Sequence, residues 1–133
     1  MSQRIPVIVI VALPHSGSHL LSQLLGAQTQ CLSIGELHNY DKLTNRSSGG
    51  GGNVISSYAD DTIFAQLDRL PVERWHSTIL ERAKERYPAV TTLVYNSKRV
   101  TWCRALMKNS RLEVHPVHLI RDPRALLRYW MLS

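Results

Sequence analysis

Five β-branched residues in a row, at positions 7–11, form the most regular hydrophobic pattern in the chain, and Pro6 and Pro14 bound them. An unbroken run of this kind is typical of a strand that is buried on both faces, at the centre of a parallel sheet. A polar turn follows, and then four leucines within residues 20–25 are spaced as one face of a helix. Strand, turn and helix in this order are the typical opening of an α/β domain.

The alternation of strand and helix patterns continues to the end of the chain. The sequence predicts a short strand at 31–37 that ends at Gly35 and Glu36, and a short helix at 63–70. The next helix begins at Pro71, carries Trp75, Ile79 and Ala83 on one side, and stops at Pro88. The remaining predicted elements are a strand at 90–95, a helix with Trp102, Leu106 and Met107, a strand at 114–120, and a last helix with Leu126, Leu127 and Trp130. Alternating elements of this kind predict an α/β fold with a parallel sheet and right-handed crossovers.

Length and composition predict one domain. The 133 residues, 44% of them hydrophobic, are enough for a single core, and we expect residues 1–133 to fold as one unit. Residues 44–57 carry four of the seven glycines and predict a flexible loop. The longest uncharged apolar run, residues 5–13, has nine residues, whereas a membrane-spanning helix needs about 20. No signal-peptide cleavage pattern follows this run, so we expect no membrane span and a cytoplasmic location.

The two cysteines, Cys31 and Cys103, are 72 positions apart and neither belongs to a C-x-x-C pair. This spacing does not predict a zinc site. Reduced thiols in a cytosolic protein are the favoured interpretation, and a single disulfide is the alternative.

The net charge of +6 is concentrated near one end of the chain. Residues 1–97 carry eight basic and eight acidic side chains, while residues 98–133 carry eight basic ones against Glu113 and Asp122. This excess indicates either a solvated helix face or a site for an anionic ligand, such as nucleic acid or a phosphorylated small molecule.

The turn L-P-H-S-G-S-H-L at residues 13–20 is the first candidate site. A loop between a buried strand and a helix directs backbone N–H groups and the positive end of the helix dipole toward the carboxyl edge of the sheet. Gly17 permits a positive φ, and we expect the hydroxyls of Ser16 and Ser18 to cap the helix and bind phosphate oxygens. An ordinary turn with a serine cap is the alternative.

The ATP-binding pattern GxxxxGK[ST] fits this turn poorly. Ala12, Gly17, Ser18 and His19 fall on its four fixed positions, and only Gly17 matches. Because the phosphate-neutralising lysine and the Mg²⁺-binding hydroxyl are both absent, metal-assisted phosphoryl transfer is disfavoured.

The segment V-H-L-I-R-D-P-R-A-L-L at residues 117–127 is the second candidate site. Arg121 follows the last predicted strand, on the edge of the sheet where ligands bind, and a guanidinium can hold a phosphate with two hydrogen bonds. Alternatively, Arg121 and Asp122 pair with each other or cap the next helix.

Together these segments resemble the sulfotransferase family, in which a P-[RK]-S-G-[ST] loop and a distant R-D-P-R-A segment follow two strands. Residues 14–18 and 121–125 carry the resemblance, Y-N-S-K within residues 94–98 is similar to the family's D-[KS]-S-K, and residues 34–37 match its I-G-E-L. The resemblance implies a three-layer α/β sandwich similar to P-loop nucleoside triphosphate hydrolases. It also implies 3′-phosphoadenosine-5′-phosphosulfate as the sulfuryl donor, and no metal.

Residue roles follow from the resemblance. The 5′-phosphosulfate would lie against Ser16, Gly17, Ser18, His19 and Leu20, and the 3′-phosphate against Arg121. Glu36 falls where some family members place the catalytic base, with His38 as an alternative. His15 stands where the family has the Arg or Lys that supports the leaving group, and Tyr129 stands where it has a Ser of the 3′-phosphate site. The chain ends soon after Arg121, as in a short or truncated member.

The resemblance implies transfer of a sulfuryl group to a hydroxyl of a small molecule, a glycan or a protein tyrosine. The departures at His15 and Tyr129 favour the alternative, a catalytically impaired module that binds nucleotide or a partner. A nucleic-acid partner is disfavoured because no recognised motif and no interleaved aromatic residues accompany the basic segment. Association into a homo-oligomer is left open.

Overall fold

The computed structural model describes residues 3–37 and 62–132, and the glycine-rich segment at 44–57 lies outside them. Four strands form one sheet: β1 (Ile5–Ala12), β2 (Cys31–Gly35), β3 (Thr92–Lys98) and β4 (Leu112–Leu119). Their order is β2-β3-β1-β4, and all three pairings are parallel. The predicted α/β fold with a parallel sheet is therefore confirmed, and β1 lies inside the sheet as expected.

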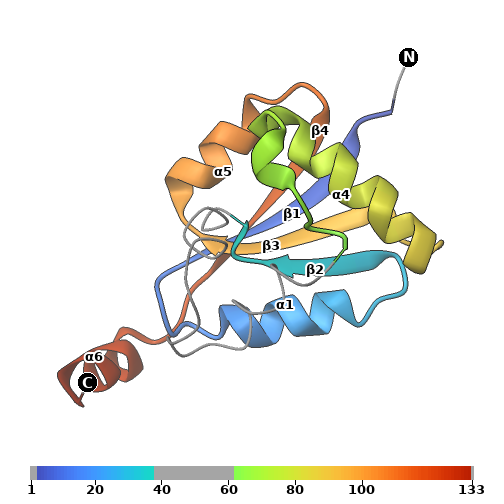
Figure 1. Cartoon of the computed structure of the whole chain (residues 1–133). Helices are drawn as coiled ribbons and strands as arrows, with labels where there is room; N and C mark the ends of the chain where they lie inside the picture. Colours follow the sequence, from blue (N-terminus) through green and yellow to red (C-terminus); the bar gives the residue numbers. More distant parts are fainter. Residues whose placement is uncertain (1–2, 38–61, 133) are drawn as a thin grey trace.

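Helices cover both faces of the sheet (Figure 1). Helix α1 (Ser18–Gly26) lies on one face, while α4 (Val72–Arg86) and α5 (Val100–Met107) lie on the other, which makes three layers. Helix α6 (Pro123–Leu132) follows β4 and lies beyond the edge at which the strands end. None of the helices within residues 3–37 and 62–132 is long and apolar enough to cross a lipid bilayer.

The β-branched run in β1 supplies side chains to two separate cores. Val7 and Val9 belong to the larger core with α4 and α5, and Ile10 belongs to the smaller core with Leu21 and Leu25 of α1. Successive side chains of a strand point to opposite faces, so a strand with helices above and below it needs apolar residues at every position. This requirement explains why the run is unbroken.

Helix α4 presents Trp75, Ile79 and Ala83 to the larger core, as their spacing predicts. The helix begins at Val72, so Pro71 is its N-cap residue and not its first helical residue. The prediction of a helix at 63–70 is wrong, because only a 3-10 turn, η2 (Leu67–Arg69), forms there. Gln66 directly before it has φ 60°, a left-handed conformation that interrupts a right-handed helix.

Strand β4 pairs with β1 along its whole length, and no other described strand lies on its far side. Most of its side chains are exposed. Pro116 lies in the middle of the strand, which an edge strand tolerates because one row of its backbone groups faces away from the sheet. Glu113 and His115 are also exposed, and Oε1 of Glu113 lies 3.2 Å from Nε2 of His115.

The two cysteines are free and lie on opposite faces of the sheet. Cys31 packs against the α1 core, and Cys103 is buried in the α4–α5 core. Burial raises the pKa of the Cys103 thiol.

Candidate functional site

The two segments predicted to bind the donor meet at the carboxyl edge of the sheet. Strands β1 and β4 pair in parallel from Ile5↔Leu112 to Ala12↔Leu119, so the segments that follow them begin side by side. The guanidinium Nη1 of Arg121 donates a hydrogen bond of 2.7 Å to the backbone oxygen of His15, across 106 positions of sequence. The ring of His15 also lies against the ring of Tyr129, with 3.8 Å between the centroids.

The β1–α1 loop presents free backbone N–H groups. Gly17, at φ 91°, is the N-cap residue of α1, and no side chain in the described part of the chain caps the helix. The first N–H groups of α1 therefore have no side-chain acceptor, and the positive end of the helix dipole lies at the same place. This arrangement favours an anion.

The expectation that Ser16 and Ser18 cap α1 is wrong. Both side chains are buried, and the left-handed Gly17 occupies the N-cap position between them. His15 also has a positive φ, of 67°. Two left-handed residues on either side of Ser16 turn the chain sharply from β1 into α1, so the backbone of this loop, more than its hydroxyls, shapes the anion position.

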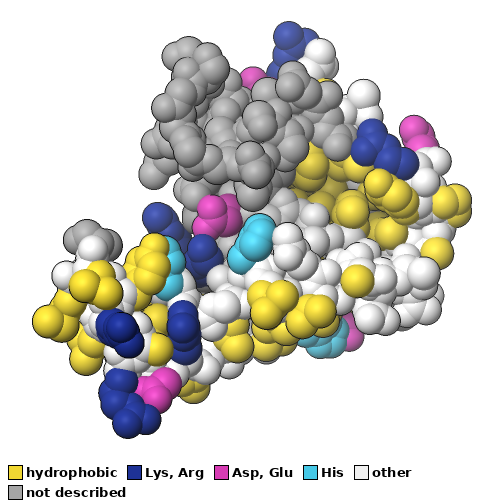
Figure 2. Space-filling model, turned by 90° about the horizontal axis from the view of Figure 1, so that it is seen from below, with side chains coloured by type: hydrophobic (Ala, Val, Ile, Leu, Met, Phe, Trp, Pro, Cys, Tyr) yellow, Lys and Arg dark blue, Asp and Glu magenta, His cyan; other side chains and the backbone are white. Residues whose placement is uncertain are grey.

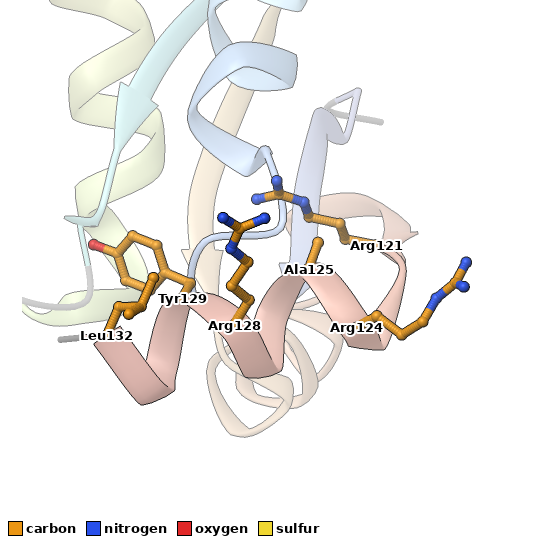
Figure 3. A pocket seen from close by; sticks show the side chains of 6 residues that line it. All are labelled: Arg121, Arg124, Ala125, Arg128, Tyr129 and Leu132. Atoms are coloured by element: carbon orange, nitrogen blue, oxygen red, sulfur yellow. The ribbon is translucent and has the colours of Figure 1, made fainter.

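A pocket of about 580 Å³ lies beside this loop, along one face of α6 (Figure 3). Arginine side chains from α6 and from the segment before it dominate its lining, which consists of Arg121, Arg124, Ala125, Arg128, Tyr129 and Leu132. The side chains of Arg121 and Arg128 extend toward the side of the β1–α1 loop, and that of Arg124 points away.

Arg124 forms an ion pair with Asp122. Its Nη2 lies 2.9 Å from Oδ2 of Asp122, and the same carboxylate accepts a hydrogen bond from the backbone N–H of Arg124 at the start of α6. These hydrogen bonds hold the pKa of Asp122 below its usual value. Asp122 thus caps α6, one of the alternatives above, but pairs with Arg124 and not with Arg121. Arg121 and Arg128 form no ion pair with any residue in 3–37 or 62–132, so their charges can meet a ligand.

The surface that α6 forms is both basic and apolar. Figure 2 shows Lys or Arg and hydrophobic side chains gathered there, at the left of the view. The hydrophobic members include Leu127, Trp130 and Met131, all exposed. A ligand with a phosphate and a planar ring would meet both kinds of side chain at this surface.

Glu36 lies farther along the same edge. It follows β2, and its Oε1 accepts a hydrogen bond of 3.3 Å from Nζ of Lys98 at the end of β3. Lys98 is the register partner of Val11, next to the end of β1. The structure therefore places Glu36 two strands from the β1–α1 loop, with Lys98 between them, and does not bring it into contact with His15 or Arg121.

Two buried polar atoms near the end of β3 have no hydrogen-bond partner among the described residues. They are Oδ1 of Asn96 and Oγ of Ser97, and these side chains are 4% and 1% exposed. A buried polar group without a partner costs about 1–3 kcal/mol, so it calls for a water molecule, an ion or a ligand. Both atoms lie on the strand between Glu36 and the β1–α1 loop.

The remaining predicted residues have simpler positions. His19 is exposed, and its Nε2 lies 3.1 Å from Nε2 of Gln23 one turn later. Leu20 is 61% exposed at the start of α1. His38 lies outside the described residues. Within residues 3–37 and 62–132, no three His, Cys, Asp or Glu side chains cluster as metal ligands.

Sequence reasoning assigned no site role to Lys98, Ser97, Asn96 or Arg128. The Y-N-S-K segment at the end of a strand was a usable signal for the first three, since the carboxyl ends of parallel strands share one edge. The spacing of Arg128 could have identified it, because residues three positions apart lie on the same face of a helix. Arg128 follows Ala125 by three positions, and both residues line the pocket.

No protein-family model matches the chain, and no curated protein matches it. Among solved structures, it is similar to a chain from one described as "Structure of Pnkp1/Rnl/Hen1 complex", with a TM-score of 0.49 and 8% sequence identity. The match covers 96% of this chain and 40% of that one, so this chain spans less than half of that neighbour's length. A likeness of this size assigns neither a family nor a function.

Proposed function

We propose that the chain is a sulfotransferase-like protein that binds 3′-phosphoadenosine-5′-phosphosulfate and transfers its sulfuryl group to an acceptor hydroxyl. One observation carries the proposal: Arg121, of the R-D-P-R-A segment, donates a 2.7 Å hydrogen bond to His15 of the P-H-S-G-S loop. The two segments that resemble the family's two phosphate sites are therefore in contact, although they are at opposite ends of the sequence.

The donor's two anionic groups would bind at two different positions in the site. The N–H groups at the start of α1, behind Gly17, would hold the 5′-phosphosulfate. Arg121 would hold the 3′-phosphate, with Arg128 as a second cation on the same side of the pocket and the Tyr129 hydroxyl as a donor. Both positions would bind a group that is anionic at neutral pH, and neither requires a metal ion.

Glu36 would act as the base for the acceptor. Its carboxylate removes the hydroxyl proton as the acceptor oxygen forms a bond to sulfur, while the bond between sulfur and the oxygen of the 5′-phosphate breaks. That oxygen takes the electron pair of the broken bond, and the N–H groups of the loop stabilise its charge. Nζ of Lys98, 3.3 Å from Oε1 of Glu36, would hold the carboxylate in position.

The second candidate function is a nucleotide-binding or interaction module without turnover. The stacking of His15 on Tyr129 favours it, because the ring at the position that would support the leaving group is already in contact with α6. On either candidate we place the protein in the cytoplasm. The acceptor class, whether small molecule, glycan or protein tyrosine, belongs to the first candidate alone.

A thermal-shift titration with 3′,5′-adenosine bisphosphate, the desulfated product, tests the binding site. Ligand at a hundredfold excess over Kd should raise the free energy of unfolding by about 2.7 kcal/mol. Arg121→Ala should abolish the rise, while Arg104→Ala, an exposed arginine on α5, should leave it unchanged. A rise that is equal with ATP, or that persists in Arg121→Ala, would reject the assigned site.

A transfer assay separates the two candidates. Radiolabelled donor is incubated with a panel of hydroxylated acceptors, using the wild type and Glu36→Gln. Transfer that falls at least about a hundredfold in Glu36→Gln supports the base, given the usual contribution of such a group. Nucleotide binding with no transfer to any acceptor would support the module instead.

A further inference from the structure

A second cavity lies on the opposite side of the sheet from α1, between α4 and α5, and the proposed function makes no use of it. Its volume is about 210 Å³, and its walls are the start of α4 and the end of α5. That volume falls below the 300–1,000 Å³ of drug-sized sites. It therefore suits a ligand of about amino-acid size.

His76 lines this cavity although its side chain is only 1% exposed. Its Nδ1 is held by the buried hydroxyl of Tyr95, at 2.5 Å. Nε2, the other ring nitrogen, makes no hydrogen bond to any residue in the described ranges. Burial lowers the pKa of His76 to about 4, so the ring is neutral at physiological pH. Where Tyr95 donates to Nδ1, Nε2 carries the proton and is a free donor.

The other lining residues divide into apolar walls and two opposite charges. Trp102 lies beside His76, with 6.4 Å between the ring centroids, and Leu106 is buried next to it. Glu73 and Lys108, which are both exposed to solvent, also line the cavity, and neither forms an ion pair with a described residue. A cavity with one unpaired carboxylate, one unpaired ammonium group and an aromatic wall matches a molecule that carries both charges and an apolar side chain.

We propose that the α4–α5 cavity binds a free α-amino acid with an apolar side chain. Its carboxylate lies between Lys108 and Nε2 of His76, its ammonium group faces Glu73, and its side chain lies along Trp102. This site is independent of the donor site, because it shares no lining residue with the pocket along α6. Tyr95 connects the two regions, since it holds His76 and directly precedes Asn96 and Ser97 in β3.

The test is an NMR titration of ¹⁵N-labelled protein with L-leucine. We expect saturable shifts of the Trp102 indole N–H, of the amides near Glu73 and Lys108, and of Nε2 of His76. N-acetyl-L-leucine lacks the ammonium group and L-leucinamide lacks the carboxylate, so each should bind at least about tenfold more weakly, as expected for the loss of one charge-assisted contact.

Two variants and two matched controls locate the site. Glu73→Gln and Lys108→Gln should each weaken L-leucine binding about tenfold. Glu85→Gln and Lys84→Gln change exposed residues of α4 outside the cavity and should leave binding within about twofold of wild type. Absence of shifts with L-leucine, equal binding of either blocked analogue, or unchanged affinity in Glu73→Gln and Lys108→Gln would overturn the proposal.

Discussion

The core around β1 and β3 differs sharply from the arm, which we define as β4 through α6 (residues 112–132). Val7, Val9 and Leu93 are fully buried in the core, as is Ile79 of α4. In the arm, most side chains of β4 are exposed, and Leu126 is the buried residue of α6. One part of the molecule is therefore held by packing on both faces of a strand, and the other by backbone pairing and a few contacts.

The candidate donor site lies where these two regions meet. The β1–α1 loop belongs to the core, whereas Arg121 and Tyr129 belong to the arm, and His15 contacts both. Local stability follows the amount of buried apolar surface, so we expect the arm to open more readily than the core. An anion between the loop and the arginines would add contacts that hold the arm in place, which couples ligand binding to local order.

The largest expected difference between the regions comes from truncating one side chain in each. Ile79→Ala removes a fully buried side chain and should lower the free energy of unfolding by about 2–5 kcal/mol. Leu127→Ala, at a residue that is 55% exposed, should change it by less than about 0.5 kcal/mol. Urea denaturation measures both, and equal losses would show that the arm is packed as tightly as the core.

The pH dependence of stability should report the core through His76. An unfolded imidazole takes up a proton near pH 6.5, whereas burial lowers the folded pKa to about 4. The unfolded state thus binds more protons than the folded state between these pH values. The contribution of the neutral His76 to the free energy of unfolding is therefore present in full above about pH 6.5 and is lost as the pH falls toward 4. We expect a loss of about 2 kcal/mol between pH 7 and pH 5, by urea denaturation at each pH.

Two glutamine variants isolate the contribution of His76. His76→Gln retains a hydrogen-bonding side chain near Tyr95 but does not titrate, so most of the loss between pH 7 and pH 5 should disappear. His19→Gln removes an exposed histidine and should retain it. An unchanged pH dependence in His76→Gln would assign the loss to other groups.

Gly17 tests the loop between the regions. A Cβ at this position would meet no atom within 4 Å, so the cost of Gly17→Ala comes only from φ 91°. We expect a loss of about 1–2 kcal/mol in the free energy of unfolding. Gly17→Asn should lose less, because Asn tolerates the left-handed region better than Ala. Equal losses would indicate a cause other than backbone conformation.

The smallest expected effect concerns the attachment of the arm. Tyr129→Ala removes the ring contact with His15 and should lower global stability by less than about 1 kcal/mol. Amide hydrogen exchange in α6 should nevertheless accelerate several-fold, while exchange in β1 and β3 stays unchanged. Leu127→Ala on the same helix is the control, and equal acceleration in both variants would remove the special role of the ring contact.

Elements that pack against the sheet were predictable because their periodicity records burial. The apolar run of β1 and the spacing of Trp75, Ile79 and Ala83 both describe how many faces of an element meet the core. The predicted helix at 63–70 failed because one residue, Gln66, adopts a left-handed conformation that no local pattern indicates. Backbone exceptions of this kind depend on tertiary contacts, and sequence periodicity does not carry them.

The candidate site was predictable in its parts and not in its assembly. The S-G-S turn and Arg121 both stand out in the sequence. Their proximity depends on the pairing of β4 with β1, and the pattern of residues along the chain does not determine the order of strands in the sheet. The ion pair between Asp122 and Arg124 likewise depends on side-chain conformation. So does the lack of a hydrogen-bond partner, among the described residues, for Oδ1 of Asn96 and Oγ of Ser97. The buried pair of His76 and Tyr95 joins two elements and has no local signature.

Pro116 in the outer strand has a consequence for how the chain behaves at high concentration. An exposed, unpaired strand is a template on which a second molecule can add its own strand and begin a fibril. Pro116 interrupts that template because it offers no N–H, and the exposed Glu113 and His115 place polar groups beside it. Replacing Pro116 with valine would restore a backbone N–H at this position and place a third valine close to Val114 and Val117 in the strand, which removes the interruption. The ring of Pro116 thus removes one hydrogen-bond donor that a strand of a second molecule would need in order to pair with β4.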